Sequence, residues 1–285
     1  MPRIFAQIVH HPLAYELGPL QITGFGLAIL LSFVIGQIIL QQELERRGED
    51  PGPAGDMVFA AVIGGLLGAK IYYAILTQDA GSLVSRAGFV FWGGLIGGIV
   101  AVSALVVVKK LGLARMSDVS GIALAGAYAV GRTGCWAVGD DYGRPFNGPW
   151  ATVFPQGAPP STAGNMSSMF GVGFPPGTPQ NQVIAVHPTQ IYEVGMGFVM
   201  FLILWHFRDH KHARGWLMGF YCALAGVERF IVEFFRAKDD RLFGGALTIA
   251  QVIALIFAAG GVAIMFARWN VTPTSPGIYA KRHAA

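Results

Sequence analysis

Seven apolar runs, each close to twenty residues long, constrain this chain more than any other feature. A bilayer core of about 30 Å is crossed by about 20 residues of α-helix. Only 13% of the 285 residues are charged, whereas globular proteins average about 25%. We therefore predict an all-α polytopic membrane protein with seven transmembrane helices, forming one integral membrane domain over residues 1–285. The predicted spans are 20–40, 57–76, 89–108, 119–138, 190–207, 216–235 and 246–266.

Lysine and arginine residues divide unequally between the two sets of connecting segments. One set carries eleven of them: Arg46, Arg47, Lys109, Lys110, Arg115, Arg208, Lys211, Arg214, Arg268, Lys281 and Arg282. The other carries six: Arg3, Arg86, Arg144, Arg236, Lys238 and Arg241. Because cytoplasmic loops are enriched in Lys and Arg, we expect the N-terminus outside and the C-terminus inside. Residues 139–189 then form a long external loop and residues 267–285 a cytoplasmic tail.

The composition argues against several functional classes. The net charge of +4 forms no basic stripe, so nucleic-acid binding is a poor interpretation. Two cysteines show neither a disulfide framework nor the spacing of metal ligands. The first apolar run is too long for the core of a cleavable signal peptide, and we expect it to remain in the protein. We expect neither a cofactor nor a metal, because no nucleotide-binding loop or ligand cluster is present.

Five charged residues fall inside the predicted spans at a similar depth. Lys70, Arg132 and Arg229 each lie fourteen residues beyond the inner end of their span, about 21 Å at 1.5 Å per residue. Glu193 lies near the outer start of its span, and Glu233 lies one turn outward of Arg229. Charges within a membrane need a partner, water or a ligand. Their common depth predicts a polar cavity that opens towards the outer leaflet.

Two arginines make the strongest candidate for an anion site. Arg132 lies between Gly131 and Gly134, where a lipid headgroup can approach closely, and a guanidinium suits bidentate binding of a phosphate. The alternative is that Arg132 pairs with Glu193 or Glu233 solely to fix helix packing. Arg229, Glu233 and Arg236 follow at i, i+4 and i+7, which predicts one helix face and an Arg229–Glu233 pair.

Several nearby residues have plain structural interpretations beside the functional ones. His187 precedes a helix that starts at Pro188 and is either a capping histidine or part of the site. Asp140 belongs to an acidic turn that is either solvated or catalytic, and Cys135 is most simply a small packing residue. Lys70 either reaches the membrane surface or lines the cavity.

The motifs together resemble the bacterial prolipoprotein diacylglyceryl transferase family over most of the chain. They are residues 24–27, 64–73, 93–98, 131–134, 142–145, 187–193 and 229–236. The resemblance implies an integral enzyme of the bacterial cytoplasmic (inner) membrane. It would transfer the diacylglyceryl group of phosphatidylglycerol to the lipobox cysteine of a prolipoprotein. Its partners would be that lipid, prolipoprotein signal peptides and the surrounding membrane lipid.

The resemblance also implies roles for individual residues. Arg132 and Arg229 would bind the phosphate, with Glu193, Glu233 and Arg236 in support, and His187 and Gly143 match the motifs. Four positions depart from the family pattern. Trp92 replaces the usual histidine, Cys135 an asparagine, Phe25 a tyrosine and Asp140 a glutamate. Indole cannot act as a base near neutral pH, so the resemblance leaves the acceptor of the thiol proton open, with His187, Asp140 and Glu193 as candidates.

We predict a transferase in which Arg132 and Arg229 hold the lipid phosphate while a thiolate attacks the adjacent glyceryl carbon. The substrate would also lie against Arg236, Gly143, Lys70, Cys135, Trp92 and Phe25. One alternative is a non-catalytic or altered-substrate homologue that binds anionic lipid or signal peptides. A lower-ranked alternative is a lipid or anion transporter.

Overall fold

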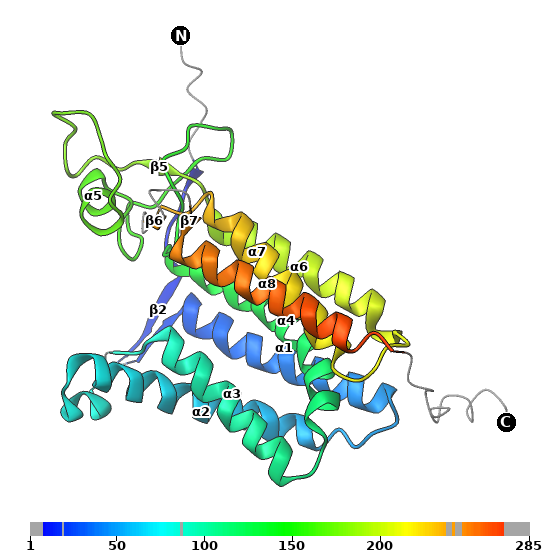
Figure 1. The fold of residues 1–285 in the computed structure, drawn as a ribbon. Helices are drawn as coiled ribbons and strands as arrows, with labels where there is room; N and C mark the ends of the chain where they lie inside the picture. Colours follow the sequence, from blue (N-terminus) through cyan, green and yellow to red (C-terminus); the bar gives the residue numbers. More distant parts are fainter. Residues whose placement is uncertain (1–7, 19, 86–87, 238–240, 243–246, 271–285) are drawn as a thin grey trace.

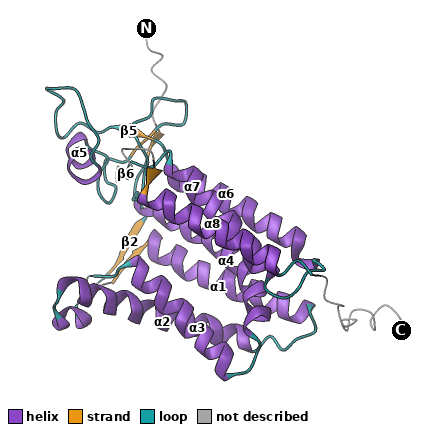
Figure 2. Cartoon of the chain, in the orientation of Figure 1, coloured by secondary structure: helices purple, strands orange, loops and turns teal. Residues whose placement is uncertain are grey.

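The computed structural model describes residues 8–18, 20–85, 88–237, 241–242 and 247–270, and most of them are helical (Figures 1 and 2). Within these residues the long helices number seven, with a short α5 (Ala163–Phe170) between the fourth and the fifth. The long helices are α1 (Gly24–Arg46), α2 (Pro53–Thr77), α3 (Phe91–Val108), α4 (Leu113–Val138), α6 (Thr189–His206), α7 (Trp216–Glu233) and α8 (Ile249–Ala267). Short 3-10 helices, η1 and η2, cover Ala80–Val84 and Phe207–Asp209.

Helix α4 is the centre of the bundle. It packs against α1 on one side and against α6 and α7 on the other, while α2 pairs with α3 and α7 with α8. Figure 1 shows the α2–α3 pair on one flank and the α6, α7 and α8 group on the opposite flank, with α1 and α4 between them. Any side chain near the C-terminal end of α4 therefore lies between the two flanks.

Five of the described helices are long and apolar enough to cross a membrane. They are α1, α2, α3, α8 and the segment Thr189–Asp209 that contains α6. Helix α7 carries Glu228, Arg229 and Glu233 within eighteen residues, which lowers its hydropathy. The chain is a mostly helical, polytopic membrane protein. The helices that carry the predicted site are the more polar ones, because they face other helices.

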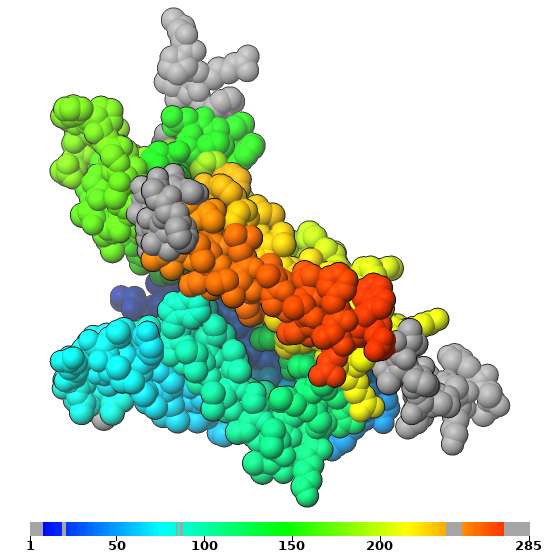
Figure 3. Space-filling model, viewed as in Figure 1, coloured from blue at the N-terminus to red at the C-terminus, as the bar shows by residue number. Residues whose placement is uncertain are grey.

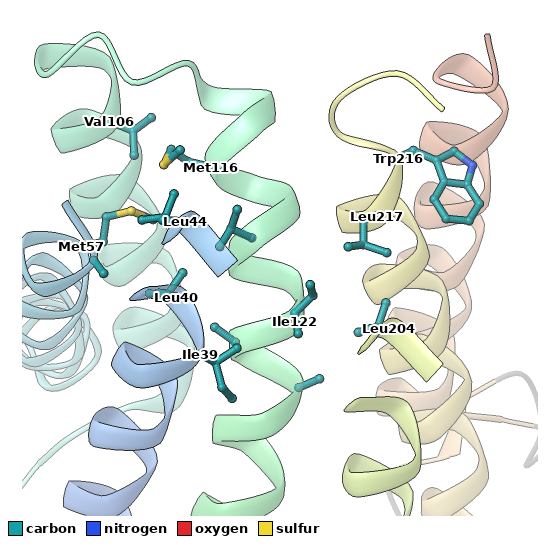
Figure 4. Close-up of a cluster of buried hydrophobic side chains, with 14 of the residues drawn as sticks. Ile39, Leu40, Leu44, Met57, Val106, Met116, Ile122, Leu204, Trp216 and Leu217 are labelled. Carbon is teal, nitrogen blue, oxygen red and sulfur yellow. The ribbon is translucent and has the colours of Figure 1, made fainter. Parts of the chain in front are cut away.

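The hydrophobic core gathers residues of α1, α2, α3, α4, α6 and α7 (Figure 4). Ile122 of α4, Leu204 of α6 and Leu217 of α7 are fully buried, and Leu44 of α1 is 1% exposed. At the same end, the buried Asp118 carboxylate accepts hydrogen bonds from the backbone N–H of Gly215 and Met218, at 2.7 and 3.0 Å. This carboxylate caps α7 and fixes it against α4.

Glycines bring α2 and α3 into backbone contact. A Cβ atom at Gly68 would lie 2.3 Å from the Gly93 carbonyl oxygen, and one at Gly64 would lie 2.6 Å from the Gly97 oxygen. Small residues of this kind let membrane helices approach closely, where dispersion contacts hold them together. The α2–α3 pair is therefore a tightly packed unit.

Residues 139–188, predicted as a structureless external loop, are folded. Strand β1 (Ile8–Val9) runs parallel to β4 (Thr152–Val153), which pairs antiparallel with β5 (Ala185–Val186). Phe154 and Met166 are fully buried in a small core of their own, together with Tyr142. Phe154 is thus an internal packing residue.

The first predicted span begins four residues too early. Strands β2 (Ala14–Leu17) and β3 (Leu20–Thr23) form an antiparallel hairpin, and α1 starts only at Gly24. The Thr23 side chain accepts a hydrogen bond from Gly26 N at 3.1 Å and thereby caps the helix. Apolarity alone does not separate these strand residues from the helix that follows.

The remaining boundaries differ by a few residues. Helix α7 ends at Glu233, and the short strands β6 (Arg241–Leu242) and β7 (Leu247–Thr248) precede α8. Helix α8 starts at a capping box in which Thr248 and Gln251 bond each other's backbone N–H. Arg3, Arg86, Lys238, Lys281 and Arg282, used to predict the orientation, lie outside the described residues, as does the tail beyond residue 270.

Candidate functional site

Arg132 lies in the last two turns of α4, with its side chain only 15% exposed. Its guanidinium pairs with the Glu193 carboxylate from the first turn of α6, which is 3% exposed. A second nitrogen, Nη1, donates to Asp141 Oδ2 at 3.0 Å. The predicted pairing of Arg132 with Glu193 is therefore present, and a second carboxylate accompanies it.

Arg236 reaches the same two carboxylates from another element. Its Nη2 donates to Asp141 Oδ1 at 2.6 Å, and its Nη1 lies 3.8 Å from Glu193 Oε1. The prediction that Arg236 continues the α7 face was wrong, because the helix ends at Glu233. The backbone N–H of Phe234 and Phe235 instead bond carbonyls three residues earlier, which tightens the turn and redirects Arg236. Two arginines and two carboxylates thus alternate in a closed cluster.

Asp141 joins the two arginines and was not among the predicted site residues. Its backbone has a φ of 55°, a left-handed conformation that turns the chain sharply after α4. Burial alone would raise its pKa, but the Arg236 and Arg132 guanidiniums outweigh burial and hold the pKa at about 2. The sequence signal that could have found Asp141 is the pair of adjacent aspartates in the acidic turn, together with the arginines of two motifs.

Asp140, the predicted member of the turn, has a different environment. Burial, reinforced by the Asp141 charge, raises the pKa of Asp140 to about 6. Its backbone oxygen accepts a hydrogen bond from the side-chain amide of Gln190. Asp140 is the one of the two aspartates that changes charge near neutral pH.

Arg229 forms the predicted pair with Glu233, with Nη2 2.6 Å from Oε2. The Arg229 side chain is 35% exposed, whereas Glu233 is buried. Arg229 Nη1 is buried without a hydrogen-bond acceptor among the described residues. The pair therefore leaves a donor available, as the sequence indicated.

Gly143 lies where three segments converge. Its N–H donates to the His187 carbonyl oxygen at 2.8 Å, and its neighbour Arg144 donates to the Phe235 oxygen at 2.8 Å. A Cβ atom at Gly143 would lie 2.3 Å from that Phe235 oxygen. Glycine is required here by close backbone packing, which holds the turn bearing Asp141 against the segment bearing Arg236.

His187 supports the site from outside the charged cluster. Its ring stacks on Phe146 with centroids 3.9 Å apart, and its Nδ1 lies 3.1 Å from the Tyr192 hydroxyl. Burial lowers its pKa below the ordinary value. The aromatic enclosure fits the structural interpretation of His187, as a residue that fixes the start of α6.

Cys135 lies beside the cluster, with Sγ 3.2 Å from Arg132 Nη1. Among the described residues, the ligand atoms of Cys135, Asp140 and Asp141 lie within 4.8 Å of one another, close enough to hold a metal ion. Asp141 is already bonded to two guanidiniums, and the adjacent positive charges oppose a cation. The donor set does not fit a resident metal.

The other predicted substrate contacts lie on neighbouring helices. Phe25, 40% exposed in the first turn of α1, packs against Gly134 of α4. Trp92 is 44% exposed at the start of α3 and meets Phe91 edge to face. Lys70 on α2 donates to the Ser85 carbonyl oxygen at 2.5 Å and lies over the Phe89 ring. Phe25 is adjacent to the charged cluster, whereas Lys70 and Trp92 belong to the α2–α3 pair.

An apolar cavity of about 370 Å³ lies between α1, α2, α3 and α4. Its lining includes Ser32 and Ala127, and Ser32 also faces Gly131, next to Arg132. Figure 3 shows the hollow between the α2–α3 pair and α8, with the inner helices behind it. A hydrocarbon chain in this cavity would begin close to the charged cluster.

Comparison with known proteins gives concordant matches. Residues 12–267 match the family model for prolipoprotein diacylglyceryl transferase. A phosphatidylglycerol–prolipoprotein diacylglyceryl transferase of Bordetella bronchiseptica is 31% identical, over 90% of this chain and 95% of the relative. Proteins of the same name from Xanthomonas oryzae and Nitratidesulfovibrio vulgaris are 30% and 32% identical, over 95% and 92% of this chain and 97% and 94% of the relatives.

Proposed function

Because the chain belongs to the prolipoprotein diacylglyceryl transferase family, we propose that it transfers the diacylglyceryl group of phosphatidylglycerol to a prolipoprotein cysteine. The product is a thioether, and glycerol phosphate is released. This is the first step in the maturation of a bacterial lipoprotein.

One observation carries the assignment of the phosphate site. Arg132 Nε and Arg229 Nη1 are buried donors that bond no acceptor among the described residues. Leaving a buried donor unsatisfied costs about 1 to 3 kcal/mol, more when it is charged. A phosphate oxygen would satisfy both nitrogens, and Glu193 and Glu233 already pair with other nitrogens of the same two guanidinium groups.

The proposed chemistry is displacement at carbon. The thiolate attacks the glyceryl carbon next to the phosphate, a C–S bond forms, and the C–O bond breaks with its electron pair on the phosphate oxygen. Arg132 and Arg229 stabilise the charge that develops there, by a factor of about 100 to 1000 per donor if they resemble oxyanion donors. Glu193, Glu233 and Arg236 hold the two arginines in place.

The neighbouring features suit a lipid substrate. The apolar cavity beside Ser32 would take an acyl chain, and Phe25 and Cys135 would line the passage from that cavity to the phosphate. Gly143 keeps the turn close to Arg236. Trp92 and Lys70, on the α2–α3 pair, would contact the lipid further from the phosphate.

We further propose that all seven long helices span the bacterial inner membrane, with the N-terminus outside and residues 267–285 in the cytoplasm. The Lys and Arg distribution supports this orientation. The charged cluster and residues 139–189 would then face the outer leaflet. There the lipid headgroup and the cysteine that follows a signal peptide can both arrive.

The test is transfer of labelled diacylglyceryl from phosphatidylglycerol to a lipobox peptide by the purified protein. Arg132→Ala should abolish transfer while the protein stays folded. Arg115→Ala is a matched control, because Arg115 lies at the other end of α4 and pairs with Glu49 at 3.5 Å. Retained activity in Arg132→Ala would rule out the phosphate clamp.

The same assay separates the alternative functions. A folded protein that binds phosphatidylglycerol without transferring it would be a binding homologue. Movement of labelled lipid between leaflets without thioether formation would identify a transporter.

A further inference from the structure

A buried carboxylate next to the phosphate arginines has no role in the clamp. Glu228 precedes Arg229 on α7 and is 7% exposed. Its Oε1 accepts a hydrogen bond from the Tyr128 hydroxyl at 3.0 Å. Tyr128 lies on α4, one turn before Arg132. The Tyr128–Glu228 pair therefore joins the two helices that carry the proposed phosphate ligands, at the level of those ligands.

The charges around Glu228 come from every element near it. Arg229 on its own helix, Arg132 on α4 and Arg236 beyond α7 all interact with it electrostatically. Tyr221, about two turns earlier on α7, also interacts with it electrostatically. A neutral hydrogen bond would join α4 to α7 without the cost of burying an ionisable group. The presence of the ionisable Glu228 carboxyl at this position therefore indicates chemistry beyond helix packing.

The transfer reaction requires an acceptor for the thiol proton, and two of the three candidates named from the sequence, His187 and Glu193, are poorly arranged for it. Trp92 stands where the family pattern has histidine, and indole accepts no proton near neutral pH. His187 is enclosed by aromatic rings, with Nδ1 engaged by Tyr192. Glu193 is tied to two arginines. By contrast, the Glu228 carboxylate accepts its hydrogen bond from one neutral group, the Tyr128 hydroxyl.

We propose that Glu228, oriented by the Tyr128 hydroxyl, accepts the proton of the acceptor cysteine in this reaction. The proposal rests on the transferase function proposed above. The proton passes from the thiol to the Glu228 carboxylate, and the thiolate forms the C–S bond as the glyceryl C–O bond breaks. Glu228 then returns the proton to the phosphate oxygen that received the electron pair. Atoms and charge balance without a further reactant. Tyr128 is a positioning residue.

The decisive experiment compares two acceptor peptides on one enzyme preparation. One lipobox peptide carries cysteine and the other selenocysteine, whose selenol is ionised at neutral pH and needs no base. Glu228→Gln, which keeps the side-chain shape, should slow transfer to the cysteine peptide by about 100-fold, as expected for loss of a general base. It should slow transfer to the selenocysteine peptide far less. The ratio of the two rates does not depend on the fraction of folded protein.

Tyrosine variants and a pH profile provide independent readouts. Tyr128→Phe should lower kcat for the cysteine peptide and leave KM for phosphatidylglycerol unchanged. Tyr221→Phe removes a neighbouring hydroxyl and should leave kcat unchanged. A carboxylate base must be deprotonated, so kcat/KM falls as the pH is lowered, and Glu228→Gln should remove that acidic limb.

Two results separate the failure of this proposal from failure of the transferase function. Equal losses with both peptides in Glu228→Gln, while the unaltered protein is active, would show that Glu228 only positions Arg229. An unaltered, folded protein that transfers to neither peptide would overturn the transferase function itself.

Discussion

The molecule buries arginine–carboxylate clusters at both ends of its bundle, and they are built differently. At the end of the bundle that contains the hydrophobic core, Glu43 of α1 is 1% exposed and forms ion pairs with Arg46, Arg47 and Arg208. Both oxygens of the Glu43 carboxylate accept hydrogen bonds, one of them from Arg46 at 2.8 Å. One guanidinium nitrogen, Arg47 Nη2, bonds no acceptor among the described residues. We call these residues the Glu43 cluster.

At the other end, the charges are not all satisfied. We call Arg132, Asp141, Glu193 and Arg236, with the adjacent Arg229–Glu233 pair, the Arg132 cluster. Among the described residues, Arg132 Nε and Arg229 Nη1 bond no acceptor there, and Glu233 Oε1 bonds no donor, although Glu233 Oε2 pairs with Arg229. A buried carboxylate whose oxygens are fully bonded holds helices together, whereas unsatisfied donors near an apolar cavity are available to a ligand. The comparison predicts that changes in the Arg132 cluster affect activity and changes in the Glu43 cluster affect stability.

The largest expected effect is on catalysis at Arg229. Arg229→Ala should reduce kcat/KM by about 100- to 1000-fold, because it removes a donor to the leaving phosphate. Initial rates with labelled phosphatidylglycerol measure the loss. Arg208→Ala removes an arginine from the Glu43 cluster instead and should keep the rate per folded molecule. Similar losses of rate in both variants would contradict the distinction between the clusters.

The Glu43 cluster should show the converse behaviour. Glu43→Ala leaves three arginines without their buried partner and should lower the free energy of unfolding by about 3 to 5 kcal/mol. Thermal unfolding in detergent micelles measures the change. Transfer per folded molecule should be preserved at low temperature, and a catalytic defect in the protein that remains folded would argue against the comparison.

Gly143→Ala tests how the Arg132 cluster is assembled. The new methyl group would displace the Phe235 carbonyl, which lies 2.3 Å from its position, and separate Asp141 from Arg236. We expect about a tenfold loss of kcat, comparable to roughly 1.4 kcal/mol of transition-state stabilisation. Gly173→Ala is the control, because its Cβ meets nothing within 4 Å. Unchanged kinetics in Gly143→Ala would show that this close approach does not set the geometry.

The smallest expected effect concerns pH. Burial and the Asp141 charge place the pKa of Asp140 at about 6. Below that pH Asp140 takes up a proton and the turn next to the Arg132 cluster loses one negative charge, so anionic lipid should bind a few-fold more tightly at pH 5 than at pH 7. Asp140→Asn should remove this difference. Equilibrium binding of a phosphatidylglycerol analogue provides the measurement, and a persistent pH dependence in the variant would assign it to another group.

Sequence reasoning located the main parts of the Arg132 cluster because intramembrane charge is costly. Arg132, Glu193, Arg229 and Glu233 stood out as ionisable groups in apolar runs, and their two ion pairs are present. The seven long helices were located because their residues form long, mostly uncharged apolar runs. Most of their boundaries were predicted to within a few residues. Their spanning of the membrane and their orientation stay predictions.

Other features depend on tertiary contacts that the local sequence indicates weakly or not at all. Asp141 depends on a left-handed backbone conformation and on Arg236, 95 residues later, as well as on Arg132, nine residues earlier. Tyr128 and Glu228 are a hundred residues apart, and nothing in either segment indicates the hydrogen bond between them. Strand β3 was predicted as the start of the first helix because its residues continue directly into α1. The roles assigned to the site residues also stay predictions.

The parallel pairing of β1 with β4 has a consequence for how the protein is made. Ile8 pairs with Thr152, so a strand synthesised at the beginning waits for a partner that leaves the ribosome more than a hundred residues later. Helices α1, α2, α3 and the whole of α4 intervene. The segment that follows the turn bearing Asp141 can therefore complete its pairing with β1 only after four long helices have been synthesised.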